Sequence, residues 1–181
     1  MIIGITGPIG AGKSTVAKYL TTKGFSHYSV RAYLAEILHA RNEPLSRAAL
    51  VAVANELRQA EGSTYVMHEV LKNAKSENDL IVVESVRAQG DADAVRRAGG
   101  VILAVTSLAE VRYERLIARS GVTVPVTFAE FCKQDALEQQ SSDPAKQSID
   151  ALVADADYVI NNTRDQNSLH TEVDSVLKFM I

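Results

Sequence analysis

A glycine-rich loop close to the start of the chain constrains the fold more than any other feature. The loop follows the apolar run 2–6 and reads Gly7-Pro8-Ile9-Gly10-Ala11-Gly12-Lys13-Ser14. Its glycines free backbone N–H groups to surround phosphate oxygens, Lys13 adds a positive charge, and Ser14 offers a hydroxyl to Mg²⁺. The pattern predicts a nucleotide-binding loop between a buried strand and a helix. The residues expected to contact the nucleotide phosphates are Gly7, Gly10, Ala11, Gly12, Lys13, Ser14 and Thr15.

Short apolar runs rich in β-branched residues indicate the strands of a buried sheet. A weaker run of the same kind covers 25–29. Amphipathic stretches separate the runs, and near the end Leu169, Val173, Val176 and Leu177 share one helical face. Alternating strands and helices predict a three-layer α/β P-loop fold with a parallel five-stranded sheet. The four stronger runs are 2–5, 80–83, 101–105 and 158–160.

The segment from about 30 to 78 has no strand signal and predicts two or three helices, broken near 42–44 and 62–63. It is too long for a plain crossover, so we expect a helical insertion beside the sheet. A second, shorter break at 120–125 predicts a mobile loop within a lid region of about 115–145. The pairs Ser107 with Glu110 and Thr127 with Glu130 have capping-box spacing and predict helix starts. Without repeats or linkers, residues 1–181 predict a single domain.

Charge and composition narrow the kind of partner and compartment. The net charge of −3 argues against polymeric nucleic acid or an anionic membrane as a partner, and no apolar run approaches the length of a membrane span. The single cysteine, Cys132, cannot form an internal disulfide and is expected in the core. We therefore expect a cytoplasmic protein with a small-molecule substrate. A monomer is plausible, although no residue indicates the oligomeric state.

Arginines indicate what receives the phosphoryl group. Transfer between two phosphates gathers many negative oxygens, which arginine, lysine and Mg²⁺ neutralise. Arg87 follows a strand at the sheet edge where ligands bind, and Arg31 and Arg58 belong to the insertion. We expect these three to bind the acceptor. Arg115 and Arg119 lie one helical turn apart before the predicted loop and are expected to close over the transferring group. Surface positions are expected for Arg47, Arg96, Arg97 and Arg164.

Glu84 ends a buried strand, where a carboxylate would hold Mg²⁺ through water together with Ser14. The alternative is an ion pair with Lys13 or Arg87 that has no metal role. A second carboxylate that could act as a base is hard to identify, because Asp135 and the nearby Asp143 are expected in surface or capping positions. The four histidines lack metal-ligand spacing, so no zinc site is predicted.

Together these residues make the chain resemble the nucleoside monophosphate kinase superfamily, with adenylate kinase-like architecture. It is most similar to small P-loop kinases described as dephospho-CoA kinase-like or deoxynucleotide kinase-like ATPases. The match rests on Glu84-Ser85-Val86-Arg87, on the insertion segment 54–58 and on the spacing of the two lid arginines. The resemblance implies that Arg58 meets the acceptor phosphate. It also implies that the final strand and turn, 156–162, pass the adenine, so that Asn162 and Thr163 line the base.

Two departures bear on the acceptor. Dephospho-CoA kinases carry an acidic residue after the second strand, where this chain has Tyr28-Ser29-Val30-Arg31. Adenylate kinases carry an Asp-Gly-Phe-Pro-Arg run, where this chain has Glu84-Ser85-Val86-Arg87. The resulting hypothesis is ATP- and Mg²⁺-dependent phosphorylation of a nucleoside or deoxynucleoside monophosphate. The alternatives are a dephospho-CoA kinase and a nucleotide-dependent switch without a small acceptor.

Overall fold

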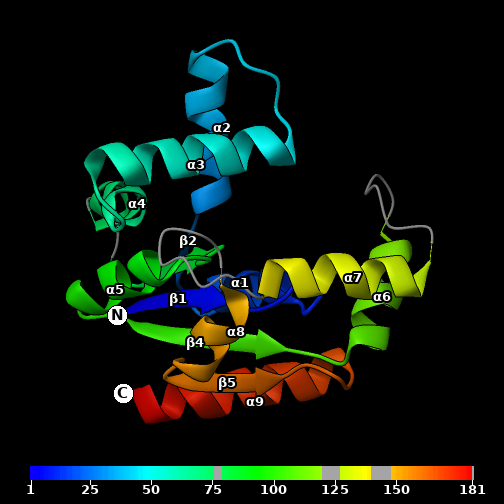
Figure 1. Cartoon of the computed structure of the whole chain (residues 1–181). Helices are drawn as coiled ribbons and strands as arrows, with labels where there is room; N and C mark the ends of the chain where they lie inside the picture. The colour runs from blue at the N-terminus through cyan, green and yellow to red at the C-terminus, as the bar shows by residue number, and fades with distance from the viewer. Residues whose placement is uncertain (76–78, 120–126, 140–147, 181) are drawn as a thin grey trace.

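The computed structural model describes residues 1–75, 79–119, 127–139 and 148–180 (Figure 1). One parallel sheet runs through it in the order β2-β3-β1-β4-β5. This confirms the predicted parallel five-stranded sheet, including the weak run at 25–29. That run contains the edge strand β2, whose side chains are only partly buried or exposed. The strands are β1 (Ile2–Thr6), β2 (Ser26–Ser29), β3 (Ile81–Glu84), β4 (Val101–Thr106) and β5 (Tyr158–Asn161).

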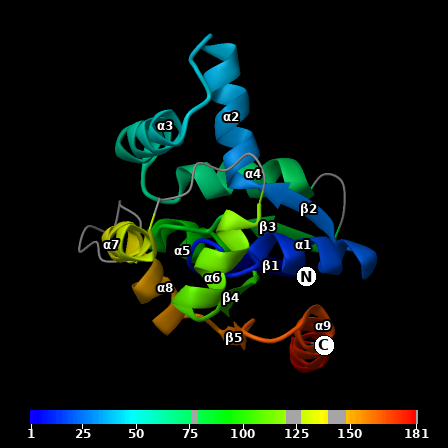
Figure 2. The same cartoon turned by 90° about the vertical axis from the view of Figure 1, so that its right-hand side faces the viewer.

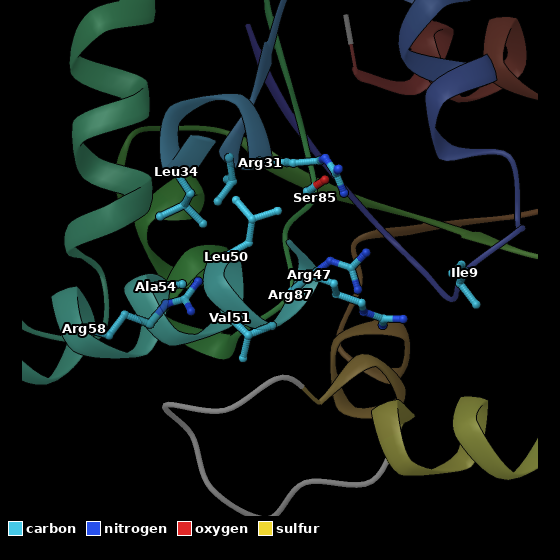
Figure 3. A pocket seen from close by; sticks show the side chains of 11 residues that line it. Ile9, Arg31, Leu34, Arg47, Leu50, Val51, Ala54, Arg58, Ser85 and Arg87 are labelled. Carbon is cyan, nitrogen blue, oxygen red and sulfur yellow. The ribbon is translucent and has the colours of Figure 1, made fainter. Parts of the chain in front are cut away.

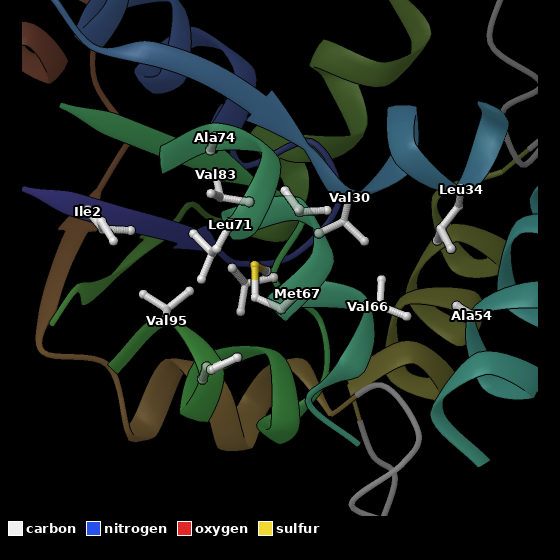
Figure 4. Close-up of a cluster of buried hydrophobic side chains, with 14 of the residues drawn as sticks. Ile2, Val30, Leu34, Ala54, Val66, Met67, Leu71, Ala74, Val83 and Val95 are labelled. Carbon is white, nitrogen blue, oxygen red and sulfur yellow. The ribbon is translucent and has the colours of Figure 1, made fainter. Parts of the chain in front are cut away.

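Two apolar clusters pack on opposite faces of the sheet and give the fold its three layers. Ile3 and Ile5 of β1 point toward α1 (Lys13–Thr22) and α9 (Gln166–Met180). Ile2, one residue earlier, belongs to the other cluster, part of which is drawn in Figure 4. The helices on that second face include α4 (Tyr65–Lys75), α5 (Gln89–Arg97) and α8 (Ile149–Ala154).

Helices fill the segment between β2 and β3, where the sequence predicted two or three. They are α2 (Val30–Ala40), α3 (Arg47–Glu61) and α4, and in Figures 1 and 2 α2 and α3 rise beyond the β2 end of the sheet. Ser29 caps α2 and Ser46 caps α3, each accepting a backbone N–H in the first turn. Gly62 ends α3 with a φ of 104°.

The two predicted helix starts near the lid have different outcomes. At α7 (Phe128–Gln139) the capping box is confirmed: Thr127 N donates to Glu130 Oε2 at 3.0 Å, and Glu130 N donates to Thr127 Oγ1 at 3.2 Å. At α6 (Ala109–Ile117) the predicted start at Ser107 is wrong, because the cap position is Leu108. The predicted loop at 120–125 lies outside the described residues. In the described parts of the chain, no helix is long and apolar enough to cross a membrane.

Candidate active site

The phosphate loop joins β1 to α1 in a conformation that requires glycine. Gly7 has a φ of 131°, and a Cβ there would lie 2.0 Å from the Val105 carbonyl oxygen. Gly12 has a φ of 98° and adopts the left-handed conformation just before α1. The buried Lys13 ammonium donates to the carbonyls of Gly7 and Pro8, at 2.8 Å each. The loop thus forms a compact turn at a helix N-terminus, a geometry in which backbone N–H groups can bind phosphate.

Asn162, the residue after β5, is hydrogen-bonded to this loop. Its backbone N–H donates to Thr106, and its side-chain Nδ2 donates to the Ala11 carbonyl at 2.8 Å. Arg115 donates to the Asn162 carbonyl at 2.9 Å, so α6 is tied to the same turn. Thr163 donates to the neighbouring Asn161 side chain. Asn162 and Arg115 are therefore brought together beside the phosphate loop, whereas Arg119 lies exposed beyond the end of α6.

Ser14 and Glu84 meet at the carboxyl ends of β1 and β3. The Ser14 hydroxyl donates to Glu84 Oε1 at 2.6 Å, and His27 Nε2 lies 3.2 Å from Oε2. Burial disfavours the charged form, but hydrogen bonds from His27 and Ser14 and the charge of Lys13 outweigh it and lower the pKa of the Glu84 carboxyl. An ionised carboxylate beside a hydroxyl is a hard-oxygen donor set of the kind that suits Mg²⁺. The residues fit the predicted metal position.

The turn after β3 is held in a strained conformation that presents Arg87. Ser85 has a φ of 76°, which is uncommon for a residue other than glycine, and residues in such conformations cluster at functional sites. The Val86 N–H donates to the Ile5 carbonyl at 3.2 Å, and Thr6 Oγ1 donates to the Val86 carbonyl at 2.9 Å. These bonds attach the turn to β1. Arg87 follows this turn and lines the same pocket as Ile9 of the phosphate loop.

Arg58, predicted to meet the acceptor phosphate, is instead paired with a carboxylate. Its Nη2 donates to both oxygens of Asp91, at 3.0 and 2.9 Å, and both residues are buried. Asp91 Oδ2 also accepts the N–H groups of Arg87 and Ala88. Arg58 lies on the wall of the pocket described next, but its guanidinium fixes the turn through Asp91. We therefore assign it a positioning role.

A pocket of about 360 Å³ opens between the insertion and the phosphate loop (Figure 3). Arg31 and Arg87, two predicted acceptor residues, line it. Arg47, predicted to lie on the surface, is exposed but also lines it. Arg47 lies three, seven and eleven residues before Leu50, Ala54 and Arg58, so the four residues share one face of α3. This spacing was the sequence signal that Arg47 lines the pocket. The described lining residues are Ile9, Val30, Arg31, Leu34, Arg47, Leu50, Val51, Ala54, Arg58, Ser85 and Arg87.

The sequence did not indicate a second buried ion pair, which links α6, α7 and the phosphate loop. Arg112 Nη1 and Nη2 donate to the two oxygens of Asp135 at 2.7 and 2.6 Å, and Nη1 also donates to the Ile9 carbonyl at 3.1 Å. The expected surface or capping role of Asp135 is wrong, since it is only 7% exposed. Arg112 precedes Arg115 and Arg119 at helical spacing, which was the available signal. Arg112 also donates to the Ser107 carbonyl.

Comparisons with known proteins find similar chains of nearly the same length. The chain is 28% identical to the UPF0200 protein PAE1629 of Pyrobaculum aerophilum, over 97% of this chain and 96% of that protein. A UPF0200 protein of Thermococcus kodakarensis is 26% identical, over 100% and 98%.

Solved structures show the same fold. The crystal structure of TT1252 from Thermus thermophilus matches with a TM-score of 0.68 at 22% identity, covering 100% of this chain and 98% of that one. Shikimate kinase from Bacteroides thetaiotaomicron matches with a TM-score of 0.59 at 16% identity, covering 99% and 98%. A gluconokinase from Sinorhizobium meliloti matches with a TM-score of 0.58 at 15% identity, covering 98% and 91%. The chain therefore has the fold of small-molecule P-loop kinases.

A family model described as an AAA domain matches residues 3–124. The match begins in β1 and spans the phosphate loop, the helical insertion, the Glu84 strand end and all of α6. It covers more than half of the sequence, and the chain belongs to this AAA domain family of P-loop proteins.

Proposed function

We propose that this protein transfers the γ-phosphoryl group of ATP, with Mg²⁺, to a nucleoside or deoxynucleoside monophosphate. One observation carries the proposal: an arginine-rimmed, apolar-walled pocket adjoins the phosphate loop, and Ile9 of that loop belongs to its lining. A molecule in the pocket would lie next to a nucleotide on the loop. Such a two-site arrangement suits a kinase better than a switch, which needs no second site.

The pocket chemistry favours an acceptor that carries a phosphate. Arg31, Arg47 and Arg87 supply positive charge, and guanidinium groups pair well with phosphate oxygens. Neither a carboxylate nor an imidazole occurs among its described lining residues. A hydroxyl acceptor needs a general base, whereas a phosphate oxygen is already ionised at neutral pH. This argues for a monophosphate over the hydroxyl that dephospho-CoA would present.

In the proposed reaction an acceptor phosphate oxygen forms a bond to the γ-phosphorus, and the bond from that phosphorus to the β–γ bridging oxygen breaks to release ADP. Lys13 and the loop N–H groups would hold the donor phosphates. Ser14 and Glu84 would hold Mg²⁺, which neutralises developing charge when bound. Arg31 and Arg87 would orient the acceptor oxygen. The lid arginines Arg115 and Arg119 would close near the transferring group, and Asn162 and Thr163 would line the donor base.

The test is ADP formation in a coupled assay with a panel of nucleoside monophosphates, nucleosides and dephospho-CoA. We expect monophosphates to stimulate ADP formation. Arg87→Ala should lower kcat/KM for the acceptor by at least about a hundredfold while ATP binding changes little, as expected when a charge-stabilising group is lost. Arg97→Ala, an exposed arginine in the last turn of α5, is the matched control.

Other outcomes would support the alternatives. If dephospho-CoA alone stimulates ADP formation, the acceptor group is a hydroxyl and not the phosphate of a nucleoside monophosphate. Slow hydrolysis that no acceptor changes would indicate a switch. Equal loss of ATP binding and acceptor turnover in Arg87→Ala would contradict the assigned role of Arg87.

A further inference from the structure

Most of the charge of the pocket lies on one side. Figure 3 shows the side chains of Arg31, Arg47 and Arg87 on the side that faces Ile9, while Leu34, Ala54 and Arg58 lie on the side away from it. An acceptor oriented by this division would point its phosphate toward the phosphate loop. Its base and sugar would then lie against α2 and α3.

The aliphatic side chains of the lining come mainly from two helices. Val30 and Leu34 come from α2, and Leu50, Val51 and Ala54 come from α3. Among the described lining residues there is no Asn, Gln, Asp, Glu, His, Thr or Tyr. Such side chains are, with arginine, the usual readers of a base edge, because they offer hydrogen-bond donors and acceptors. Of the four arginines in the described lining, Arg31, Arg47 and Arg87 lie at the end that faces Ile9.

The remaining polar groups of the lining are poorly placed to read a base. Ser85 follows β3 directly and lies two residues from Arg87, at the charged end of the pocket. Arg58 is only 5% exposed, and its Nη2 is hydrogen-bonded to Asp91. Its Nε is buried and has no partner among the described residues. Arg58 aside, the described side chains that α2 and α3 place away from the charged end of the pocket are apolar.

We infer that the acceptor site selects for the phosphate group and accepts bases by shape and apolar contact, without distinguishing their hydrogen-bonding edges. The inference rests on the proposed function and adds which nucleotide bases the acceptor site accepts. An apolar pocket discriminates by size over roughly 10- to 200-fold, whereas a site that hydrogen-bonds a group rejects an analogue lacking it by roughly 10⁴ to 10⁵. Nucleoside monophosphates whose bases have equal size but different edge groups should therefore be phosphorylated with similar efficiency.

The test compares kcat/KM within two size-matched pairs, AMP with GMP and CMP with UMP. We expect each pair to agree within about tenfold, while the corresponding nucleosides, which lack the phosphate, fall by about 10⁴-fold. A preference above about a hundredfold within either pair would overturn base tolerance and leave the kinase proposal standing. Failure of every monophosphate to stimulate ADP formation would overturn both.

A variant separates apolar contact from edge recognition. Val51→Ala removes two methyl groups from the pocket wall and should lower kcat/KM for all four nucleotides by a common factor, with an unchanged KM for ATP. Val159→Ala, on an exposed position of β5, is the control and should leave all four values unchanged. A loss confined to one nucleotide would contradict shape-based acceptance. Thermal unfolding of both variants confirms that each remains folded.

Discussion

Removing the Asp91 carboxylate should destabilise the protein and misplace Arg87. Asp91 has no exposed surface, and Arg58, which pairs with it, is 5% exposed. Asp91→Ala leaves a buried guanidinium without a counter-charge, and breaking a buried pair in this way costs roughly 3–5 kcal/mol. Two backbone N–H groups, of Arg87 and Ala88, also lose their acceptor. For a domain of this size, 3 kcal/mol corresponds to a fall in Tm of roughly 6–12 °C.

The assay is thermal and urea unfolding of Asp91→Ala beside Glu56→Ala. Glu56 lies on the same helix as Arg58 and forms a two-point pair with Arg41, at 2.8 Å for each contact, but its side chain is 57% exposed. Because solvent screens an exposed pair, Glu56→Ala should change the Tm by only a small fraction of the Asp91→Ala shift.

Kinetics separate positioning from general damage. Below its Tm, Asp91→Ala should raise the KM for the acceptor more than the KM for ATP, because the turn that carries Arg87 loses its support. Asp91→Asn keeps one acceptor oxygen for that turn and should recover part of the acceptor KM. Equal Tm shifts in Asp91→Ala and Glu56→Ala, or equal rises in both KM values, would refute the reasoning.

Two further perturbations test the donor side. Gly12→Ala should abolish ATP binding, measured by calorimetry, because the added Cβ would lie 2.2 Å from Asn162 Nδ2. Gly99→Ala is the control: Gly99 also has a positive φ, of 82°, but an added Cβ there would meet no atom within 4 Å, so this variant should bind ATP normally. Glu84→Gln should lower kcat by at least about a hundredfold. The pKa of Glu84 is lowered on folding, so its contribution to stability is present above the unfolded-state pKa and is lost as the pH falls through the folded-state pKa. The stability difference between wild type and Glu84→Gln, measured in urea, should therefore shrink on acidification, and a constant difference would contradict the pKa shift.

Local sequence patterns were enough to predict the sheet and the phosphate loop. The central strands are buried on both faces, so they appear as continuous apolar runs, and the loop glycines are required by backbone conformation. The sequence signal of the edge strand β2 (Ser26–Ser29) was weaker, because this strand is largely polar and its side chains are partly or fully exposed. The helical insertion followed from the length of a segment without strand signal.

Long-range pairing explains what the sequence did not indicate. Arg58 and Asp91 are 33 residues apart, and Arg112 and Asp135 are 23 apart. Neither pair has a local pattern, because each depends on how separate helices pack. Buried and exposed arginines look alike in sequence, so Arg58 was assigned to the acceptor and Arg112 was not identified. The cap at Ser107 was wrong for a related reason, since capping-box spacing alone does not show where a helix begins.

The destination of the transferred phosphate tests the central claim most directly. ATP labelled with ³²P at the γ position is incubated with Mg²⁺, the protein and a nucleoside monophosphate, and the products are separated by chromatography. The two-site arrangement predicts label in the nucleoside diphosphate, with label in inorganic phosphate rising only slowly. Label in inorganic phosphate alone, at a rate that the monophosphate does not change, would contradict it.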